Sequence, residues 1–416
     1  MGTRYSERTL LLLLAAVQFT HILDFMVMMP LGEQLMRDLS IGPGEFSHLV
    51  AAYTIAAGVV GFLTAPFMDR FDRRKVLLLA YAGFTVGTLA CALSKTAGML
   101  LAARAICGAF GGVSGATLMA IVGDIVPPQR RASGMAVIMG AFATAAALGV
   151  PFGLFLAQKF HYWESPFYLV AGMGAVVWIL IWIMMPHLRA HLNDTPMHHF
   201  TAFFELLRDA NVGKALVFYC ALVAGHFVMI PLLAPYMVTN LGLPEDKLFM
   251  VYMVGGICSA LTAPLCGRLA DRFGRLRVFA ILIFVAVGVT LWIANSGPMP
   301  VWAVLLSAGM FFTFASGRFI PGQAIMSLAV AARRRGSFMS LTSCTRDLTS
   351  GVISSFGGWV VTKSPSGALV NYDKLGWVAV GMSFLSLWLA SRVEVRDVHH
   401  APVTAAPGKK GIDATA

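Results

Sequence analysis

Twelve apolar stretches dominate the sequence, and each is long enough to cross a lipid bilayer. A helix needs about 20 apolar residues to span a hydrocarbon core of roughly 30 Å, and a helix satisfies its own backbone hydrogen bonds in lipid. Only 12% of the residues are charged, whereas soluble globular proteins carry about 25%. We therefore predict an all-α membrane protein with spans near residues 9–32, 46–68, 75–94, 98–122, 133–157, 163–186, 213–238, 247–268, 276–295, 300–328, 337–362 and 375–391.

A short charged motif occurs twice, once after the second span and once after the eighth. The first copy runs from Ala65 to Lys75 and the second from Gly267 to Arg277, about half the chain apart. Repetition at such a spacing indicates that one unit of six spans has been used twice. We expect a six-helix bundle over residues 1–186, a cytoplasmic linker with a helix on the bilayer surface over 187–212, a second six-helix bundle over 213–395, and a disordered tail over 396–416.

Basic residues are distributed unequally between the two sides of the predicted membrane protein. Most of the 31 Lys and Arg residues fall in every second loop and in the two termini, and such loops remain in the cytoplasm. We therefore expect both termini to be cytoplasmic, in the inner (plasma) membrane of a bacterium. The net charge of +11 suits anionic lipid at this surface, and we do not expect a nucleic-acid partner.

Ionisable side chains inside the spans are candidates for function, because each is costly in hydrocarbon unless it is compensated. In the first span Gln18, His21 and Asp24 recur at helical spacing and share one face. Counted at about 1.5 Å per residue, Asp24 lies ~12 Å and Arg104 ~9 Å below the outer surface, so the two can pair. Such a pair is either a salt bridge that fastens the first span to the fourth, or a site where Asp24 carries a proton or contacts a substrate.

The second half carries a different set of polar residues inside its spans. His226 stands at the position equivalent to Asp24, and it is either a hydrogen-bonded core residue or part of a transport site. Arg318 and Asp347 both fall near mid-membrane, and we expect them to neutralise each other. Contact with an anionic substrate group is a second role for Arg318. We expect Arg346 to pack against a neighbouring carboxylate or carbonyl.

The second copy of the charged motif resembles the loop signature of the major facilitator superfamily. The residues that match its informative positions are Gly267, Asp271, Arg272, Gly274 and Arg275. The first copy departs from the signature, with Ala65 and Asp72 where the family has glycine. The resemblance covers roughly residues 9–392 and implies twelve transmembrane helices in two pseudo-symmetric six-helix bundles.

The resemblance also implies that the two motif copies form a cytoplasmic gate. A carboxylate is attracted to the positive N-terminus of a helix, so Asp69 is expected at the start of the eleventh span and Asp271 at the start of the fifth. Asp72 is expected to pair with Arg73 or Arg74. The residues assigned to the gate are Asp69, Arg70, Arg73, Gly267, Asp271, Arg272, Gly274 and Arg275.

Further motifs narrow the resemblance. Arg104 and Gly108 are similar to the family's Arg-x-x-x-Gly pattern, and the run from Gly149 through Pro151 to Gly153 is similar to the Gly-Pro motif of its antiporter branches, with Val150 inserted. We interpret these glycines and Pro151 as helix-packing residues, and we expect Gly108 and the glycines that follow it to face the first span. Segments 23–31 and 316–321 look most like drug:proton antiporters and sugar-efflux permeases.

Together these features predict a secondary active transporter. The loops contain no nucleotide-binding, nucleophile or zinc motif, so we expect neither an enzyme nor a protein with a cofactor or metal ion. The expected function is efflux of a small organic molecule, either a drug-like compound or a sugar, coupled to protons by alternating access in a monomer. The alternatives are a symporter or uniporter for a sugar, organic acid or lipid, and a non-transporting receptor or scaffold.

Overall fold

The structure is a computed structural model, and it describes residues 5–65, 67, 70–127, 130–189, 206, 208–331, 335–394 and 396. Ten helical segments of this part of the chain are long and apolar enough to cross a membrane. They comprise α1 (Glu7–Val27), α3 (Pro43–Thr64), α4 (Arg73–Leu93), α5 (Ala97–Ile125), α6 (Arg131–Thr144) with η3 (Ala145–Gly149) and α7 (Val150–Phe160), α8 (Ser165–Met184), α10 (Ala210–Phe227) with α11 (Ile230–Thr239), α12 (Leu248–Phe273), α13 (Arg275–Ala294), and α14 (Val301–Gly317) with α15 (Phe319–Leu328).

Two more helices complete the predicted twelve passes. They are α16 (Arg335–Val360), which packs against α3 and α10, and α17 (Tyr372–Ala390), which packs against α10 and α13. Polar residues on α16 lower its hydropathy, but its neighbours cover much of its surface. The short elements are α2 (Gly32–Asp38), η5 (Glu245–Lys247), and the antiparallel strands β1 (Thr362–Lys363) and β2 (Leu369–Val370), in which Lys363 pairs with Leu369.

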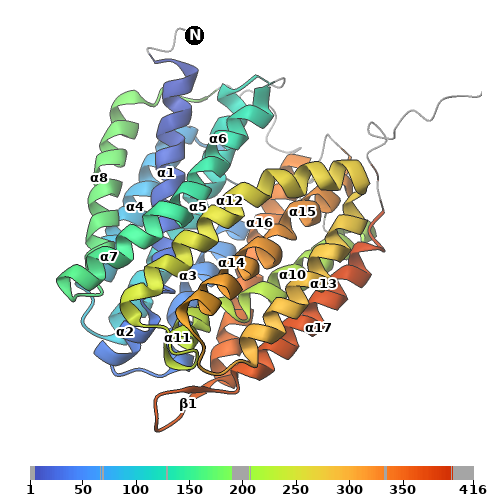
Figure 1. Cartoon of the computed structure of the whole chain (residues 1–416). Helices are drawn as coiled ribbons and strands as arrows, with labels where there is room; N and C mark the ends of the chain where they lie inside the picture. Colours follow the sequence, from blue (N-terminus) through green and yellow to red (C-terminus); the bar gives the residue numbers. More distant parts are fainter. Residues whose placement is uncertain are drawn as a thin grey trace, which may run out of the picture.

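The twelve passes form two bundles of six helices. Figure 1 shows α1 to α8, in blue to green, on one side, and α12 to α17, in yellow to red, on the other. We name the two ends of the molecule by what they carry. The terminal face contains the start of α1 and the end of α17, and the hairpin face contains α2, η5 and the β1–β2 hairpin (Figure 1).

The apolar core is shared between the bundles near the hairpin face and divided near the terminal face. One large buried cluster includes Phe46 and Trp163 from the first bundle and Tyr236 and Phe311 from the second. Towards the terminal face, one cluster lies in the first bundle and one in the second, and Phe62 and Ala65 at the end of α3 pack against the latter. The two halves therefore share a buried core at the hairpin face and touch along α3 towards the terminal face.

Glycines allow the halves to touch along α3 and α16. A Cβ atom on Gly58 of α3 would lie 2.9 Å from the backbone nitrogen of Leu348 on α16. The missing side chain lets the two backbones approach, as is common where membrane helices pack without a hydrophobic driving force between them. A second contact between the halves runs from η3 and α7 to α12.

Prolines interrupt the helices of the seventh and tenth passes, and each interruption lies about one turn before the proline. A proline has no N–H and cannot bond to the carbonyl four residues earlier, and the helices end at Phe227, four residues before Pro231, and at Gly317, four residues before Pro321. The carbonyl of Phe227 instead accepts a hydrogen bond from Ser354 at 3.4 Å. The carbonyl released at Phe227 is thus satisfied by a neighbouring side chain, as lipid requires.

Two predicted features fall outside the described residues. They are the surface helix expected in the linker and the disordered tail expected after residue 396. At the end of the linker, α10 already begins at Ala210, ahead of the predicted start at residue 213.

Candidate functional site

Asp24 on α1 and Arg104 on α5 form a fully buried ion pair. Arg104 Nη1 donates to Asp24 Oδ2 at 2.7 Å, and neither side chain is exposed. Thr88 of α4 donates to the other carboxylate oxygen at 3.1 Å, and Cys107 Sγ lies 3.8 Å from Oδ2. The predicted pairing is confirmed. Because an isolated charge is very unfavourable in an apolar interior, each of the two charges depends on the other.

Tyr53 of α3 covers the ion pair from a third helix. The guanidinium carbon of Arg104 lies 4.5 Å from the centroid of the Tyr53 ring, which is a cation–π geometry. Buried Arg104 Nε and Nη2 and the Tyr53 hydroxyl have no hydrogen-bond partner among the described residues. Buried polar atoms in native proteins nearly always have partners, so these groups indicate a place for water or a ligand.

Gly108 makes the approach of α3 possible. A Cβ atom on Gly108 would lie 2.0 Å from the carbonyl oxygen of Tyr53. The helix-packing role of Gly108 is therefore confirmed, but its predicted partner is wrong, because it meets α3 and not α1. The direction that a residue faces on α5 depends on how the whole helix is rotated in the bundle, which spacing along the sequence does not show.

His21 lies one turn before Asp24 on α1 and faces the same region. Its ring centroid lies 5.9 Å from that of Tyr53, and its buried Nε2 has no hydrogen-bond partner among the described residues. A Cβ atom on Gly111 of α5 would lie 2.5 Å from His21 Nε2 and 2.9 Å from the Tyr53 hydroxyl. Both unpartnered groups thus pack closely against Gly111, where a side chain would not fit. Gln18, also a predicted site residue, is buried about one turn before His21 on the same helix.

Asp347 pairs with its neighbour on α16 and not with Arg318. Arg346 Nε donates to Asp347 Oδ1 at 3.0 Å, whereas Arg318 donates to the Ser383 hydroxyl at 2.6 Å and to the Ala315 carbonyl at 3.1 Å. The predicted neutralisation of Arg318 by Asp347 is therefore wrong. Arg318 follows the last residue of α14, where unpaired carbonyls and the negative end of the helix dipole favour a cation.

Arg346 is the charged residue whose importance the sequence did not show. It lies within α16, yet its side chain is 47% exposed and that of Asp347 is 21% exposed. Close to it on α16, Leu348 meets Gly58 of α3, and Thr349 donates to Cys220 Sγ of α10 at 3.3 Å, so this part of α16 lies between helices of the two halves. A guanidinium exposed at this depth is costly in lipid, which indicates that the space beside it holds water.

His226 is packed as an aromatic core residue. Its ring stacks on Phe311 with a centroid distance of 5.5 Å and an interplanar angle of 10°, and it contacts Phe319 edge-on at 5.3 Å. Only 8% of its surface is exposed. The next residue, Phe227, reaches Phe25 of the first bundle at a centroid distance of 6.5 Å, so equivalent residues of the two halves meet between the bundles.

The Gly-Pro motif of the fifth pass packs against α1. Added Cβ atoms would lie 3.1 Å from Leu23 at Gly149 and 2.9 Å from Val27 at Gly153. Residues Ala145–Gly149 form a π-helical turn just before Pro151, and such turns accommodate a local misfit in the hydrogen-bond ladder. The interpretation of both glycines as helix-packing residues is confirmed.

The second copy of the charged motif connects α12 to α13. Gly274 has a φ of +94°, a conformation that favours glycine, and α13 begins at Arg275. Arg272 lies over the ring of the next residue at 5.2 Å, and the space beside Gly267 is open. Asp271 is exposed and makes no hydrogen bond or ion pair within the described chain. The described residues show no contact of Asp271 with the start of α6, and the expected contact stays a prediction.

The first copy differs from the second. Asp69 lies outside the described residues. Arg70 is exposed and lies 5.4 Å from the ring of Phe67, and Arg73 pairs with Asp124 of the same bundle at 3.1 Å. A gating role for these residues therefore stays a prediction.

Asp72 binds the end of the sixth pass instead of Arg73 or the Arg74 side chain. It caps α4 by accepting from the backbone N–H of Arg74 at 3.0 Å, and it also accepts from His187 Nδ1 at 2.6 Å and from Leu188 N and Arg189 Nε at 3.1 Å. Burial raises the pKa of Asp72, but these four hydrogen bonds outweigh burial and bring the pKa down to about 2. The predicted pairing is wrong, because residues 187–189 fold back over the start of α4.

Polar contacts between the halves lie at the hairpin face. Lys363 donates to Glu33 at 2.8 Å, Arg37 to Glu245 at 3.4 Å, and Gln158 to the Glu245 carbonyl at 2.9 Å. At the terminal face, the described ion pairs join residues of one half to each other: Arg130 with Glu7, Arg73 with Asp124, Lys214 with Glu394, and Arg396 with Asp209. The structure therefore has its hairpin face closed by contacts between the halves.

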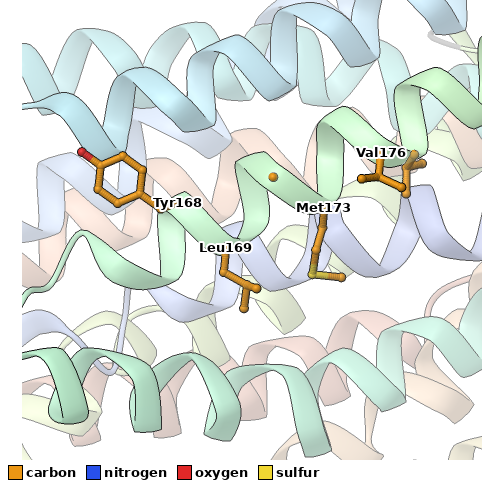
Figure 2. Close-up of a pocket in the computed structure, with 6 residues that line it drawn as sticks. Tyr168, Leu169, Met173 and Val176 are labelled. Carbon is orange, nitrogen blue, oxygen red and sulfur yellow. The ribbon is translucent and has the colours of Figure 1, made fainter.

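A shallow cavity of about 380 Å³ on α8 is not a candidate site. Figure 2 shows its lining residues Tyr168, Leu169, Met173 and Val176 on one helix. The lining is almost entirely apolar, and the helix is the outer one of its bundle in Figure 1. Such a surface suits lipid chains.

Comparisons with known proteins agree with this architecture. The sequence matches the Major Facilitator Superfamily over residues 14–354 and 215–411. It is 24% identical to the putative transporter AraJ of Escherichia coli (strain K12) over 90% of this chain and 93% of that protein. It is 25% identical to the purine ribonucleoside efflux pump NepI of Escherichia coli O157:H7 over 65% of this chain and 69% of that protein.

A solved structure shows the same fold. It is the crystal structure of a bacterial homologue of the human lysosomal transporter Spinster, in an inward-facing and unoccupied conformation. The TM-score is 0.73 at 16% sequence identity, and the match covers 94% of this chain and 98% of that one.

Proposed function

The chain belongs to the Major Facilitator Superfamily, whose members are membrane transporters and not enzymes, and on this premise we propose that it exports a small organic molecule in exchange for protons. The observation that supports this most is the buried ion pair of Asp24 and Arg104. A carboxylate sealed between helices can carry a proton between the two faces when the bundles move. The substrate then moves in the opposite direction by alternating access.

Protonation of Asp24 would change the contacts of the whole pair. A neutral carboxyl group still accepts a hydrogen bond from Arg104 Nη1, but it no longer balances the charge of Arg104, whose Nε and Nη2 already lack partners among the described residues. Arg104 contacts Tyr53 of α3, and α3 packs along α16 of the other half. A change of charge at Asp24 therefore acts on the contact between the halves, which is what coupling requires.

The direction and the setting of transport belong to the same proposal. The name of the relative NepI describes it as an efflux pump. We assign the terminal face to the cytoplasm because basic residues gather there, as in Arg73, Arg130, Lys214 and Arg275. With its hairpin face closed, the protein would then await substrate from the cytoplasm of a bacterial cell, in the inner membrane and as a monomer.

Inside-out vesicles with an acidic lumen test the proposal. The purified chain is reconstituted with a pH-sensitive dye in the lumen, and drug-like compounds, sugars and ribonucleosides are added outside. A substrate should enter the vesicles and make the lumen less acidic. Asp24→Asn should exchange the same labelled substrate down its gradient without moving protons, while Lys95→Gln, at an exposed loop, should behave as the wild type.

Each alternative predicts a different result in these vesicles. If Asp24→Asn still concentrates substrate against its gradient, Asp24 is not the coupling residue. Flux in the wild type that ignores the pH gradient indicates a uniporter, and protons that move with the substrate indicate a symporter. Either of these outcomes rejects the exchange mechanism.

A further inference from the structure

We propose that a cavity on the terminal face of the second bundle binds the headgroup of an anionic phospholipid, phosphatidylglycerol. The cavity has a volume of about 380 Å³, which is within the range of about 300–1,000 Å³ that is usual for ligand sites. It lies where α12 passes into α13, against the ends of α15 and α17 (Figure 1). Its polar side is lined by Asp271, Arg275 and Ser391, and its apolar side by Leu276, Ile325 and Leu328.

The equivalent place in the first bundle is occupied by a carboxylate. Asp72 of the first motif copy stands where the second copy has Gly274, and the next residue in each copy begins α4 or α13. The Asp72 carboxylate accepts hydrogen bonds from the start of α4 and from residues 187–189, which follow the sixth pass. A Cβ atom on Gly274 would meet no atom within 4 Å, and the cavity lies between the start of α13 and the end of the twelfth pass. The anionic group that the first bundle contains is therefore replaced in the second by space for one.

Arg275 supplies the positive charge that an anion in this cavity requires. Its side chain lines the cavity and makes no hydrogen bond or ion pair with the described residues. No side chain caps the start of α13, so the first backbone N–H groups of this helix are further donors. A phosphate group accepts hydrogen bonds from a guanidinium and from backbone N–H groups together, and its charge strengthens each of them.

Asp271 and the surrounding charges distinguish between phospholipids. The Asp271 carboxylate is exposed, has no partner among the described residues, and only accepts hydrogen bonds. The glycerol hydroxyls of phosphatidylglycerol donate such bonds, whereas the choline of phosphatidylcholine has no donor. The other charged side chains near the cavity favour a lipid with a net negative charge over zwitterionic phosphatidylethanolamine, because they are the exposed arginines Arg268, Arg272, Arg277 and Arg392.

The apolar side of the cavity is continuous with the outer surface of α13 and α17. Leu276 lines the cavity and is itself exposed. Two turns further along α13, the exposed ring of Phe284 lies 5.7 Å from the exposed ring of Phe384 on α17. Trp388, one turn before Ser391 on α17, is also exposed. Acyl chains of the leaflet at the terminal face can therefore lie along this surface while the headgroup occupies the cavity.

The chain that follows α17 holds one wall of the cavity in place. Arg396 N donates to the carbonyl of Leu328 at 2.9 Å, and Asn211 Nδ2 donates to the carbonyl of Glu394 at 2.9 Å. Leu328 and Val393 both line the cavity. The cavity is therefore preformed, and a headgroup that enters it does not have to order this wall.

Native mass spectrometry of the purified full-length chain in detergent tests the proposal, because it resolves individual bound lipids. Phosphatidylglycerol, phosphatidylethanolamine and phosphatidylcholine with identical acyl chains are titrated separately. We expect the first phosphatidylglycerol to bind roughly fivefold more tightly than either zwitterionic lipid, and Arg275→Gln to remove roughly this factor. Arg277→Gln is the matched control, because Arg277 is exposed on the same helix but does not line the cavity, and it should bind as the wild type does.

Two further variants separate the cavity from general attraction to basic residues. Ser391→Trp fills the cavity without changing the charge and should weaken phosphatidylglycerol binding severalfold. Asp271→Asn keeps an acceptor and removes a negative charge, so it should not weaken this binding, whereas an ethanolamine headgroup held by the carboxylate would lose affinity. Unchanged melting temperatures without added lipid should show that the variants remain folded.

Several outcomes overturn the proposal. One is that phosphatidylethanolamine or phosphatidylcholine binds as tightly as phosphatidylglycerol. Others are that Arg275→Gln and Arg277→Gln weaken binding equally, that Ser391→Trp has no effect, or that Asp271→Asn weakens the binding of phosphatidylglycerol. If soluble glycerol 1-phosphate displaces the lipid at equal concentration, the cavity binds a free anion and the lipid assignment is wrong.

Discussion

Replacing Asp24 with leucine would leave Arg104 charged and without a counter-ion inside the first bundle. Leucine has the same number of non-hydrogen side-chain atoms as aspartate and the same branch at Cγ, although its methyl groups are larger than the oxygens, and arginine does not lose its proton in proteins. At the observed N–O distance of 2.7 Å, and at an effective dielectric constant of about 20, the attraction within the pair is about 6 kcal/mol. Most of this attraction offsets the cost of removing both charges from water.

The two single variants and the double variant should therefore differ sharply. Removing one partner of a buried pair typically costs about 3–5 kcal/mol, whereas replacing both partners with apolar residues is close to neutral. We expect Asp24→Leu and Arg104→Met each to lower the free energy of unfolding by about 3–5 kcal/mol. The double variant should lose less than either of the single variants.

Unfolding in mixed micelles with increasing SDS, followed by tryptophan fluorescence, measures the three free energies. The interaction energy of the double-mutant cycle then isolates the pair. If the double variant loses the sum of the two single losses, the charges do not depend on each other in the folded protein. That result would refute the reading of Asp24 and Arg104 as one unit.

Two further predictions concern the ends of the molecule. The pKa of Asp72 is lowered from 3.8 to about 2, so its contribution to stability is fully present above pH 4 and is lost as the pH falls through about 2. Asp72→Ala should therefore cost about 2 kcal/mol of stability at pH 7, measured by melting. If this loss stays constant down to pH 2, the hydrogen-bonded Asp72 carboxylate is not its cause. At the hairpin face, Glu33→Lys should open the contact between the halves about two- to fivefold more often, since a partly exposed ion pair contributes about 0.5–1 kcal/mol. Adding Lys363→Glu should restore closure in spin-label distance measurements, and failure of the reversed pair to do so would count against the contact.

The sequence predicted the twelve passes because each pass is decided locally. A segment crosses the bilayer when its own length and apolar content match the hydrocarbon thickness, and ten of the described segments satisfy that condition by themselves. The pairing of Asp24 with Arg104 was also predictable, because counting residues along two helices gives their depths. Two opposite charges at equal depth in the membrane are then expected to pair, because an uncompensated charge there is costly.

Pairings that depend on how a helix is rotated were not predictable. Asp347 and Arg318 lie at comparable depth, but Asp347 bonds to Arg346 beside it, and Arg318 is held at the end of α14. Asp72 was expected to bond within its own loop, yet it binds residues 187–189, which return to it from the sixth pass. Depth along an axis says nothing about which face of a helix meets which neighbour.

The sequence alone therefore determined the membrane-spanning class, the twofold repeat, the family resemblance and the buried pair of Asp24 and Arg104. Only the tertiary structure placed Tyr53 over Arg104, left His21 Nε2 and the Tyr53 hydroxyl without partners among the described residues, and left the Arg346 side chain about half exposed. It also showed that the hairpin face is the closed one. The physical reason is that the bilayer acts on each segment separately, whereas a binding site is made by helices far apart in the chain that pack at one angle and rotation.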